Sequence, residues 1–193
     1  MHLNKLRDVS MEKSENIKEA IQKARKGIDQ YLEIMQSFRR TDVSTDMNFQ
    51  RKFNSFYRVR QRASEWYKEY YATMQREKDR QANFHSVLTH FYAVLGRYEP
   101  SFTSKLIATI DANFPVWDMY VLKNIAQRSP SYASKNKAGE AVAAYAAIQA
   151  WYEQYMKSED ARAIIAVFRD SVQEHEQISD VKKIDFVLWQ TRT

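Results

Sequence analysis

The stretch 100-PSFTSKLIATIDANFPVWDMYVLKNI-125 holds the most informative pattern of this 193-residue chain. Pro100 and the run Pro115-Val116-Trp117 each stand just before an apolar pattern with helical spacing. We therefore predict a short polar turn that opens at Pro100 and ends where Lys105 enters one helix, with Asp118 at the start of the next. This is the part of the chain where a candidate nucleophile and a candidate acid or base stand in a recognisable frame.

The rest of the chain predicts an all-α fold. It contains three glycines and three prolines, whereas a β-rich fold of this size needs many of both for its turns. A length of 193 residues suits one domain with a substantial core. We expect a single-domain helical bundle over residues 1–193, with an N-terminal helix at about 14–40 that packs against the bundle as an extension.

Apolar spacing predicts the individual helices. One stripe repeats in alternating steps of four and three residues, which is typical of an amphipathic helix. Its members are Ile17, Ile21, Ala24, Ile28, Tyr31, Met35 and Phe38. A second long helix is predicted from a further stripe made of Phe56, Val59, Ala63, Trp66, Tyr70 and Met74. Gly96 is a natural C-terminal cap for the next predicted helix, whose apolar stripe runs from Phe84 to Leu95.

Several classes of function lack their characteristic residues. The chain has no cysteine, which excludes disulfides, thiol catalysis and cysteine-bound zinc or iron–sulfur centres. Phosphate-binding, dinucleotide-binding, hydrolase and zinc-protease motifs are also missing, and we expect neither a metal nor a cofactor. Since no stretch has the length and apolarity of a membrane span or of a signal peptide, the expected location is the cytoplasm.

The charge balance favours a polyanionic partner such as DNA. The net charge is +6, and the segment from Arg51 to Arg80 carries nine basic and four acidic side chains. A local basic excess of this kind attracts nucleic acid, although many basic proteins bind none. Arg58, Arg60 and Arg62 are the candidate phosphate contacts, and the alternative is that they are solvated.

Aromatic residues alternate with these arginines between Phe53 and Tyr71. Aromatic side chains in such a segment can stack on an extruded base. Trp66 and Tyr70, however, fall on the apolar stripe of the predicted helix. We therefore favour a place in the hydrophobic core for both.

The segment PSFTSK resembles the hairpin of the helix-hairpin-helix DNA glycosylase superfamily, which reads LPGVGxKTA, and PVWD resembles the run that brings the family aspartate to a helix start. The resemblance covers about one-eighth of the chain, from Pro100 to Ile125. It retains the proline, the central apolar residue as Phe102, and the lysine as Lys105. Both family glycines are replaced, by Ser101 and Thr103.

The resemblance implies a helix-hairpin-helix glycosylase-like fold, binding to DNA and a base-excision or lyase activity. Lys105 would then be the nucleophile, and Asp118 would stabilise positive charge on the sugar or activate the nucleophile. Ser101, Thr103 and Ser104 would donate hydroxyl hydrogen bonds to a phosphate where the family uses glycine N–H groups. The start of a helix and partial burial both lower the pKa of a lysine, which favours the nucleophilic amine.

A structural interpretation of the same residues stays open. Lys105 is equally consistent with a solvated lysine on a polar helix face. Asp118 is a good helix N-cap, a role worth about 1 kcal/mol without any catalysis. The alternative function is therefore a non-enzymatic helical scaffold or protein-interaction module on the same fold. The motifs do not indicate an oligomeric state.

Overall fold

The structure is a computed structural model that describes residues 2–80, 82–124, 129–130 and 134–190. No β-strand occurs among these residues, and the predicted all-α class is confirmed. The elements in chain order are α1 (His2–Arg40), α2 (Met47–Tyr57), α3 (Ser64–Glu77), α4 (Phe84–Leu95), α5 (Pro100–Ile110), α6 (Met119–Asn124), α7 (Lys137–Tyr155), α8 (Glu159–Ser171), the 3₁₀ helix η1 (His175–Gln177) and α9 (Asp180–Gln190).

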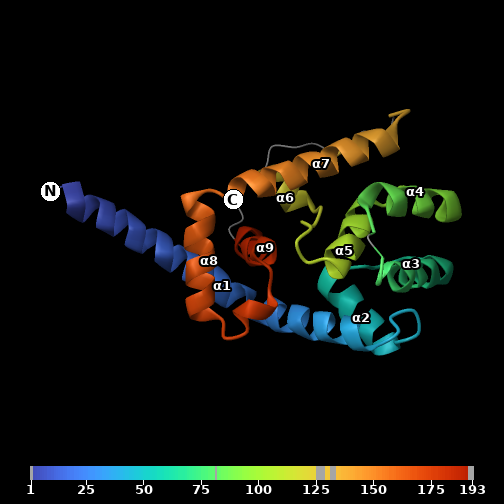
Figure 1. Ribbon diagram of the computed structural model, residues 1–193, viewed down its shortest axis with the longest axis horizontal. Coiled ribbons are helices and arrows are strands. Elements are labelled where there is room, and N and C mark those ends of the chain that lie inside the picture. The colour runs from blue at the N-terminus through green and yellow to red at the C-terminus, as the bar shows by residue number, and fades with distance from the viewer. Residues whose placement is uncertain (1, 81, 125–128, 131–133, 191–193) are drawn as a thin grey trace.

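Helix α1 is the longest element, and the other helices gather along its C-terminal part (Figure 1). It packs against α2, α8 and α9, while its first turns project away from them. All seven residues of its predicted apolar stripe are buried, which confirms that prediction. The helix begins at His2, well before the predicted start near residue 14.

The buried apolar residues form two clusters that meet along α1. The first joins most of α1 to α6, α7, α8 and α9, and we call it the C-terminal core. The second joins the end of α1 to α2, α3, α4 and α5, and we call it the central core. Trp66 and Tyr70 belong to the central core, which confirms the interpretation favoured for these two aromatics.

The prediction of one long helix through the arginine-rich segment is wrong. The structure has two helices there, α2 and α3, with a turn over residues 58–63 between them. Arg58 ends α2 in a left-handed conformation with φ 54°, and the N–H of Val59 donates to the carbonyl of Asn54 at 2.9 Å. Val59 is buried as the apolar anchor of this helix end. The apolar spacing is continuous across the break because Val59 faces the core from the turn.

The polar turn predicted at Pro100 to Ser104 is also wrong. Pro100 is the first residue of α5, and the four residues after it are helical. Proline suits this position because its ring fixes a helical φ and the missing N–H has no helical acceptor there. The helical hydrogen bonds begin at Thr103, whose N–H donates to the carbonyl of Glu99 at 2.8 Å. Lys105 thus lies in the second turn of α5, not at its entrance.

The predicted cap at Gly96 is confirmed. Gly96 ends α4 with φ 66°, and its N–H donates to the carbonyl of Tyr92 at 2.9 Å. Glycine adopts this left-handed conformation without the steric cost that a Cβ atom would add. The cap turns the chain from α4 toward α5, the helix that contains Lys105.

Candidate functional site

Lys105 is largely covered by protein and touches two different elements. Its Nζ donates to the carbonyl of Tyr57 at the end of α2, at 3.3 Å, and lies 4.8 Å from the ring centre of Phe102. Burial lowers the pKa of Lys105 to about 8; the nearby carboxylate of Asp118 opposes this shift, and Lys182 adds to it. The change from 10.5 to about 8 raises the neutral fraction of the amine at pH 7 about 300-fold.

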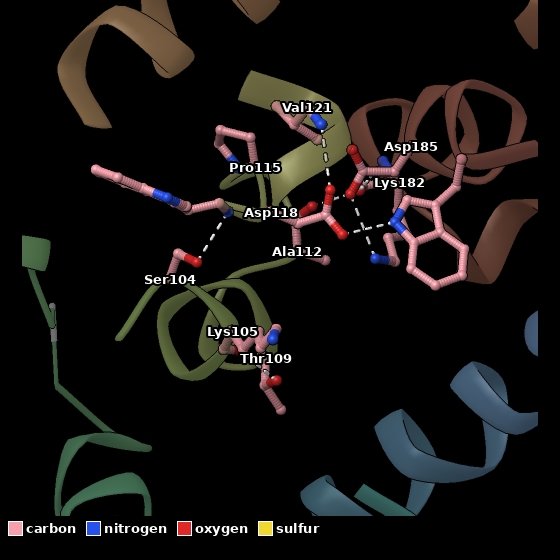
Figure 2. A network of polar contacts seen from close by, with 12 residues as sticks. Ser104, Lys105, Thr109, Ala112, Pro115, Asp118, Val121, Lys182 and Asp185 are labelled. Atoms are coloured by element: carbon pink, nitrogen blue, oxygen red, sulfur yellow. Dashed lines mark hydrogen bonds and ion pairs between the residues drawn. The ribbon is translucent and has the colours of Figure 1, made fainter. Parts of the chain in front are cut away.

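Asp118 lies between two helices and has partners on both sides. Its Oδ1 accepts from the N–H of Val121 at 3.1 Å, the hydrogen bond of an N-cap at the start of α6. Its Oδ2 accepts from Nε1 of Trp189 in α9 at 2.8 Å (Figure 2). The N-cap predicted from the sequence is present, and the indole contact adds a partner that the sequence did not suggest.

The serine hydroxyls of α5 position the segment that leads to Asp118. The Oγ of Ser101 donates to the carbonyl of Trp117 at 3.0 Å. The Oγ of Ser104 accepts from the N–H of Trp117 at 2.8 Å and donates to the carbonyl of Ser101 at 2.9 Å. Ser104 and Thr103 are fully buried. The two serines thus hold the chain before Asp118, whereas the buried hydroxyl of Thr103 has no hydrogen-bond partner.

The three arginines of the 58–63 turn have different surroundings. Arg58 is exposed, and its guanidinium carbon lies 5.1 Å from the ring centre of Trp189. Arg60 is exposed as well. Arg62 instead folds back, so that its guanidinium lies 5.0 Å from the ring centre of Phe102 and Nη2 lies 3.4 Å from Oε2 of Glu99. Two of the predicted phosphate contacts therefore face solvent, whereas Arg62 is engaged internally.

Helix α9 contributes a buried ion pair that the sequence analysis did not find. Asp185 accepts a hydrogen bond from the hydroxyl of Tyr152, and Nζ of Lys182 lies 3.3 Å from Oδ2 of Asp185. Burial raises the pKa of Asp185, and Lys182 opposes that shift. The available signal was the run 181-VKKIDFVLWQ-190, where charged residues interrupt an otherwise apolar helix.

Aromatic rings surround the ammonium group of Lys182. The ring centres lie between 5.3 and 5.8 Å from Nζ, within the range of a cation–π contact. They belong to Tyr31, Phe56, Tyr57 and Phe186. Because these rings come from α1, α2 and α9, the ammonium group sits where the two apolar cores meet.

The structure therefore joins three predicted residues that are far apart in the sequence. Lys105 contacts the carbonyl of Tyr57, Arg58 follows Tyr57 and stacks on Trp189, and Trp189 donates to Asp118. Lys105 and Asp118 also interact electrostatically. Figure 2 shows Asp118 next to Lys182 and Asp185, with Lys105 apart from these three. We call Arg58, Lys105, Asp118 and Trp189 the candidate site.

Comparison with protein-family models, with curated proteins and with solved structures gives no match. Among the residues with described side chains, no group of three or more histidine, cysteine, aspartate or glutamate residues is arranged to hold a metal ion. Within that same part of the chain, no helix combines the length and the apolar character needed to cross a membrane.

Proposed function

We propose that this protein binds DNA through the turn that carries Arg58 and Arg60, and that Lys105 reacts as an amine with the sugar aldehyde of an abasic site. One observation supports the proposal: the carbonyl of Tyr57 that Lys105 contacts directly precedes the exposed turn of Arg58 and Arg60, and Arg58 lies over the Trp189 ring that donates to Asp118. Exposed guanidinium groups together with an amine of lowered pKa suit a phosphate-bearing electrophile.

The proposed chemistry uses the neutral form of Lys105. The lone pair of Nζ attacks the aldehyde carbon C1′, the addition product loses one water molecule, and an imine joins the protein to the sugar. The carboxylate of Asp118 stabilises the positive charge of the protonated imine. The lowered pKa of Lys105 supports this role, because a lysine of ordinary pKa is almost entirely protonated at neutral pH.

The experiment combines binding and covalent capture. Affinity for plain and abasic duplexes is measured across a salt series, and borohydride is added to reduce any imine to a stable amine. We expect affinity to fall with salt, tighter binding of the abasic duplex, and a trapped adduct that Lys105→Ala abolishes. Lys68→Ala is the matched control, because Lys68 is an exposed lysine of α3 within the same basic segment. An adduct that persists in Lys105→Ala contradicts the assignment.

The second candidate is a non-enzymatic helical module that binds DNA or protein. It is favoured by Asp118, since both carboxylate oxygens have structural partners in Val121 and Trp189. Salt-dependent DNA binding without any trapped adduct identifies this module as a DNA-binding one. If neither duplex binds, both nucleic-acid proposals fail and a protein partner is the remaining candidate.

A further inference from the structure

Arg62 and Glu99 form an ion pair at the edge of the central core. Nη2 of Arg62 lies 3.4 Å from Oε2 of Glu99, and the side chains are 20% and 10% exposed. The guanidinium carbon lies 5.0 Å from the ring centre of Phe102 and 5.6 Å from that of Trp66. Arg62 therefore lies over the aromatic rings and is turned away from the solvent that Arg58 and Arg60 face.

Polar atoms lack hydrogen-bond partners in the cluster formed by this ion pair, by Trp66 next to the guanidinium and by Thr103, whose N–H donates to the carbonyl of Glu99. The four side-chain atoms that are buried without a hydrogen-bond partner, among the residues whose side chains the structure describes, all belong to this cluster. They are Nε of Arg62, Nε1 of Trp66, Oε1 of Glu99 and Oγ1 of Thr103. Buried polar groups are normally hydrogen-bonded, because a missing bond costs free energy. A guanidinium with five donors is thus held by one long contact.

A second cation already stands beside Glu99. Nε of Arg97 lies 3.5 Å from Oε1 of Glu99, an ion-pair distance at which no hydrogen bond is formed. If Arg62 moves away, the carboxylate keeps a positive partner. The main electrostatic penalty of breaking a buried pair, an isolated charge, is thereby reduced.

The backbone next to Arg62 is held away from its preferred conformation. Gln61 has φ 55° and Arg58 has φ 54°, so two residues other than glycine adopt the left-handed conformation within one short turn. Such conformations persist where surrounding contacts enforce them, and they concentrate at binding sites and switch regions. A movement of the Arg62 side chain therefore takes place at the end of a turn whose backbone conformation is already constrained.

We propose that Glu99 competes with a DNA phosphate for Arg62. Arg62 pairs with Glu99 in the free protein and exchanges that carboxylate for a phosphate when DNA binds. This inference rests on the proposed DNA binding and specifies how it is regulated. A phosphate offers the planar guanidinium two parallel charge-assisted hydrogen bonds, whereas Glu99 receives one contact at 3.4 Å. The exchange adds Arg62 to Arg58 and Arg60 as a third phosphate contact of the turn.

The test compares two variants that remove the same charge. Glu99→Gln releases Arg62 from its carboxylate and keeps the side-chain size. Glu65→Gln removes a carboxylate near the same turn whose Oε1 accepts from the hydroxyl of Ser64 at 3.0 Å and is not paired with Arg62. Binding of a plain 20-base-pair duplex is measured by fluorescence anisotropy from 50 to 200 mM salt.

We expect Glu99→Gln to bind about fivefold to tenfold tighter than the unaltered protein at each salt concentration, with an unchanged salt slope, because Arg62 contacts a phosphate in both complexes. Glu65→Gln is expected to gain about twofold with an unchanged slope. Adding Arg62→Ala to Glu99→Gln is expected to abolish the gain and to lower the slope by about 0.9, because one phosphate contact is lost. Arg62→Ala alone should lower the slope by the same amount but cost less than about twofold in affinity, because breaking the pair with Glu99 offsets most of the phosphate contact in the unaltered protein.

Equal affinities of Glu99→Gln and Glu65→Gln, or a salt slope that Arg62→Ala leaves unchanged, overturn the exchange and leave the proposed DNA binding intact. Absence of DNA binding by the unaltered protein removes the proposed function and the exchange with it. Should Glu99→Gln fail to fold, the unaltered protein provides the test through the Arg62 Nε–H and Trp66 Nε1–H resonances. Both must shift on titration with the duplex, and if they stay fixed while the resonances of Arg58 and Arg60 move, the exchange is ruled out.

Discussion

Two internal ion pairs of nearly equal length are built in different ways. Lys182 and Asp185 are 3.3 Å apart, and Arg62 and Glu99 are 3.4 Å apart. Asp185 also accepts from the hydroxyl of Tyr152, and four aromatic rings surround the ammonium of Lys182. The Arg62 pair, in contrast, leaves buried donors and acceptors without partners.

The difference lies in which elements supply the surrounding groups. The Lys182 pair sits where the two cores meet, so that α1, α2, α7 and α9 all contribute to it. The Arg62 pair lies between a turn and the start of α5, close to the surface. We therefore expect two pairs of nearly equal length to differ in strength: the first stabilises the fold, whereas the second can exchange its carboxylate for a phosphate.

The largest effect is expected from Asp185→Ala. This change leaves the ammonium of Lys182 buried without its carboxylate and removes the acceptor of the Tyr152 hydroxyl. We expect a loss of about 3–5 kcal/mol in the free energy of unfolding, measured by urea denaturation. In a double-mutant cycle, Lys182→Met with Asp185→Ala should cost less than the sum of the single changes. An additive cycle would show that the pair is not coupled.

The next largest effect is expected in the pH dependence with which Lys105 is acylated. Its amine should be acylated with a pH midpoint of about 8, read by mass spectrometry after brief labelling across a pH series. Lys182→Met should raise this midpoint, because Lys182 disfavours the charged form of Lys105. Asp118→Asn should lower it, because the carboxylate favours the charged form. A midpoint near 10.5 in the unaltered protein would remove the basis for a reactive amine.

Two substitutions at Asp118 separate the contribution of its N-cap to stability from that of its charge. Asp118→Ala removes the N-cap of α6 and the acceptor of the Trp189 indole, and we expect a loss of about 1–2 kcal/mol in the free energy of unfolding. Asp118→Asn keeps an oxygen for the cap and should lose about half as much. Thermal unfolding measures both, and an equal loss in the two variants would show that the charge, not the cap, stabilises this region.

Glu99→Gln should cost the fold least. Glutamine keeps the size of the side chain and an acceptor oxygen, and Arg62 remains stacked on Phe102. We expect a change below about 0.5 kcal/mol in the free energy of unfolding by urea denaturation. A loss as large as that of Asp185→Ala would mean that both ion pairs fasten the fold, which would erase the contrast between them.

The sequence predicted those features that depend on neighbours along the chain. The stripe from Ile17 to Phe38 identified α1 because apolar residues at helical spacing must share one buried face. Gly96 identified a cap because only a residue without Cβ adopts φ 66° at no steric cost. Asp118 was recognised as an N-cap for the equally local reason that its side chain reaches the N–H three residues on.

The same local rules failed where a distant contact decides the conformation. The spacing from Phe56 to Met74 continues through the turn at Arg58, and only the burial of Val59 against the central core shows that the helix stops. Pro100 fits a turn and a helix start equally well. In the structure it starts a helix, and the hydroxyls of Ser101 and Ser104 form hydrogen bonds with the backbone of Trp117.

The sequence by itself thus determined the helical class, the face of α1 that is buried and the residues able to carry chemistry. The tertiary structure alone decided which of them meet. Lys105 acquires its lowered pKa from burial between α2 and α5, and Asp185 acquires its partner from α7, thirty-three residues earlier in the chain. Both depend on desolvation and on charges supplied by other helices. A residue's position along the chain fixes its chemistry, but the helices packed around it determine its pKa and its partner.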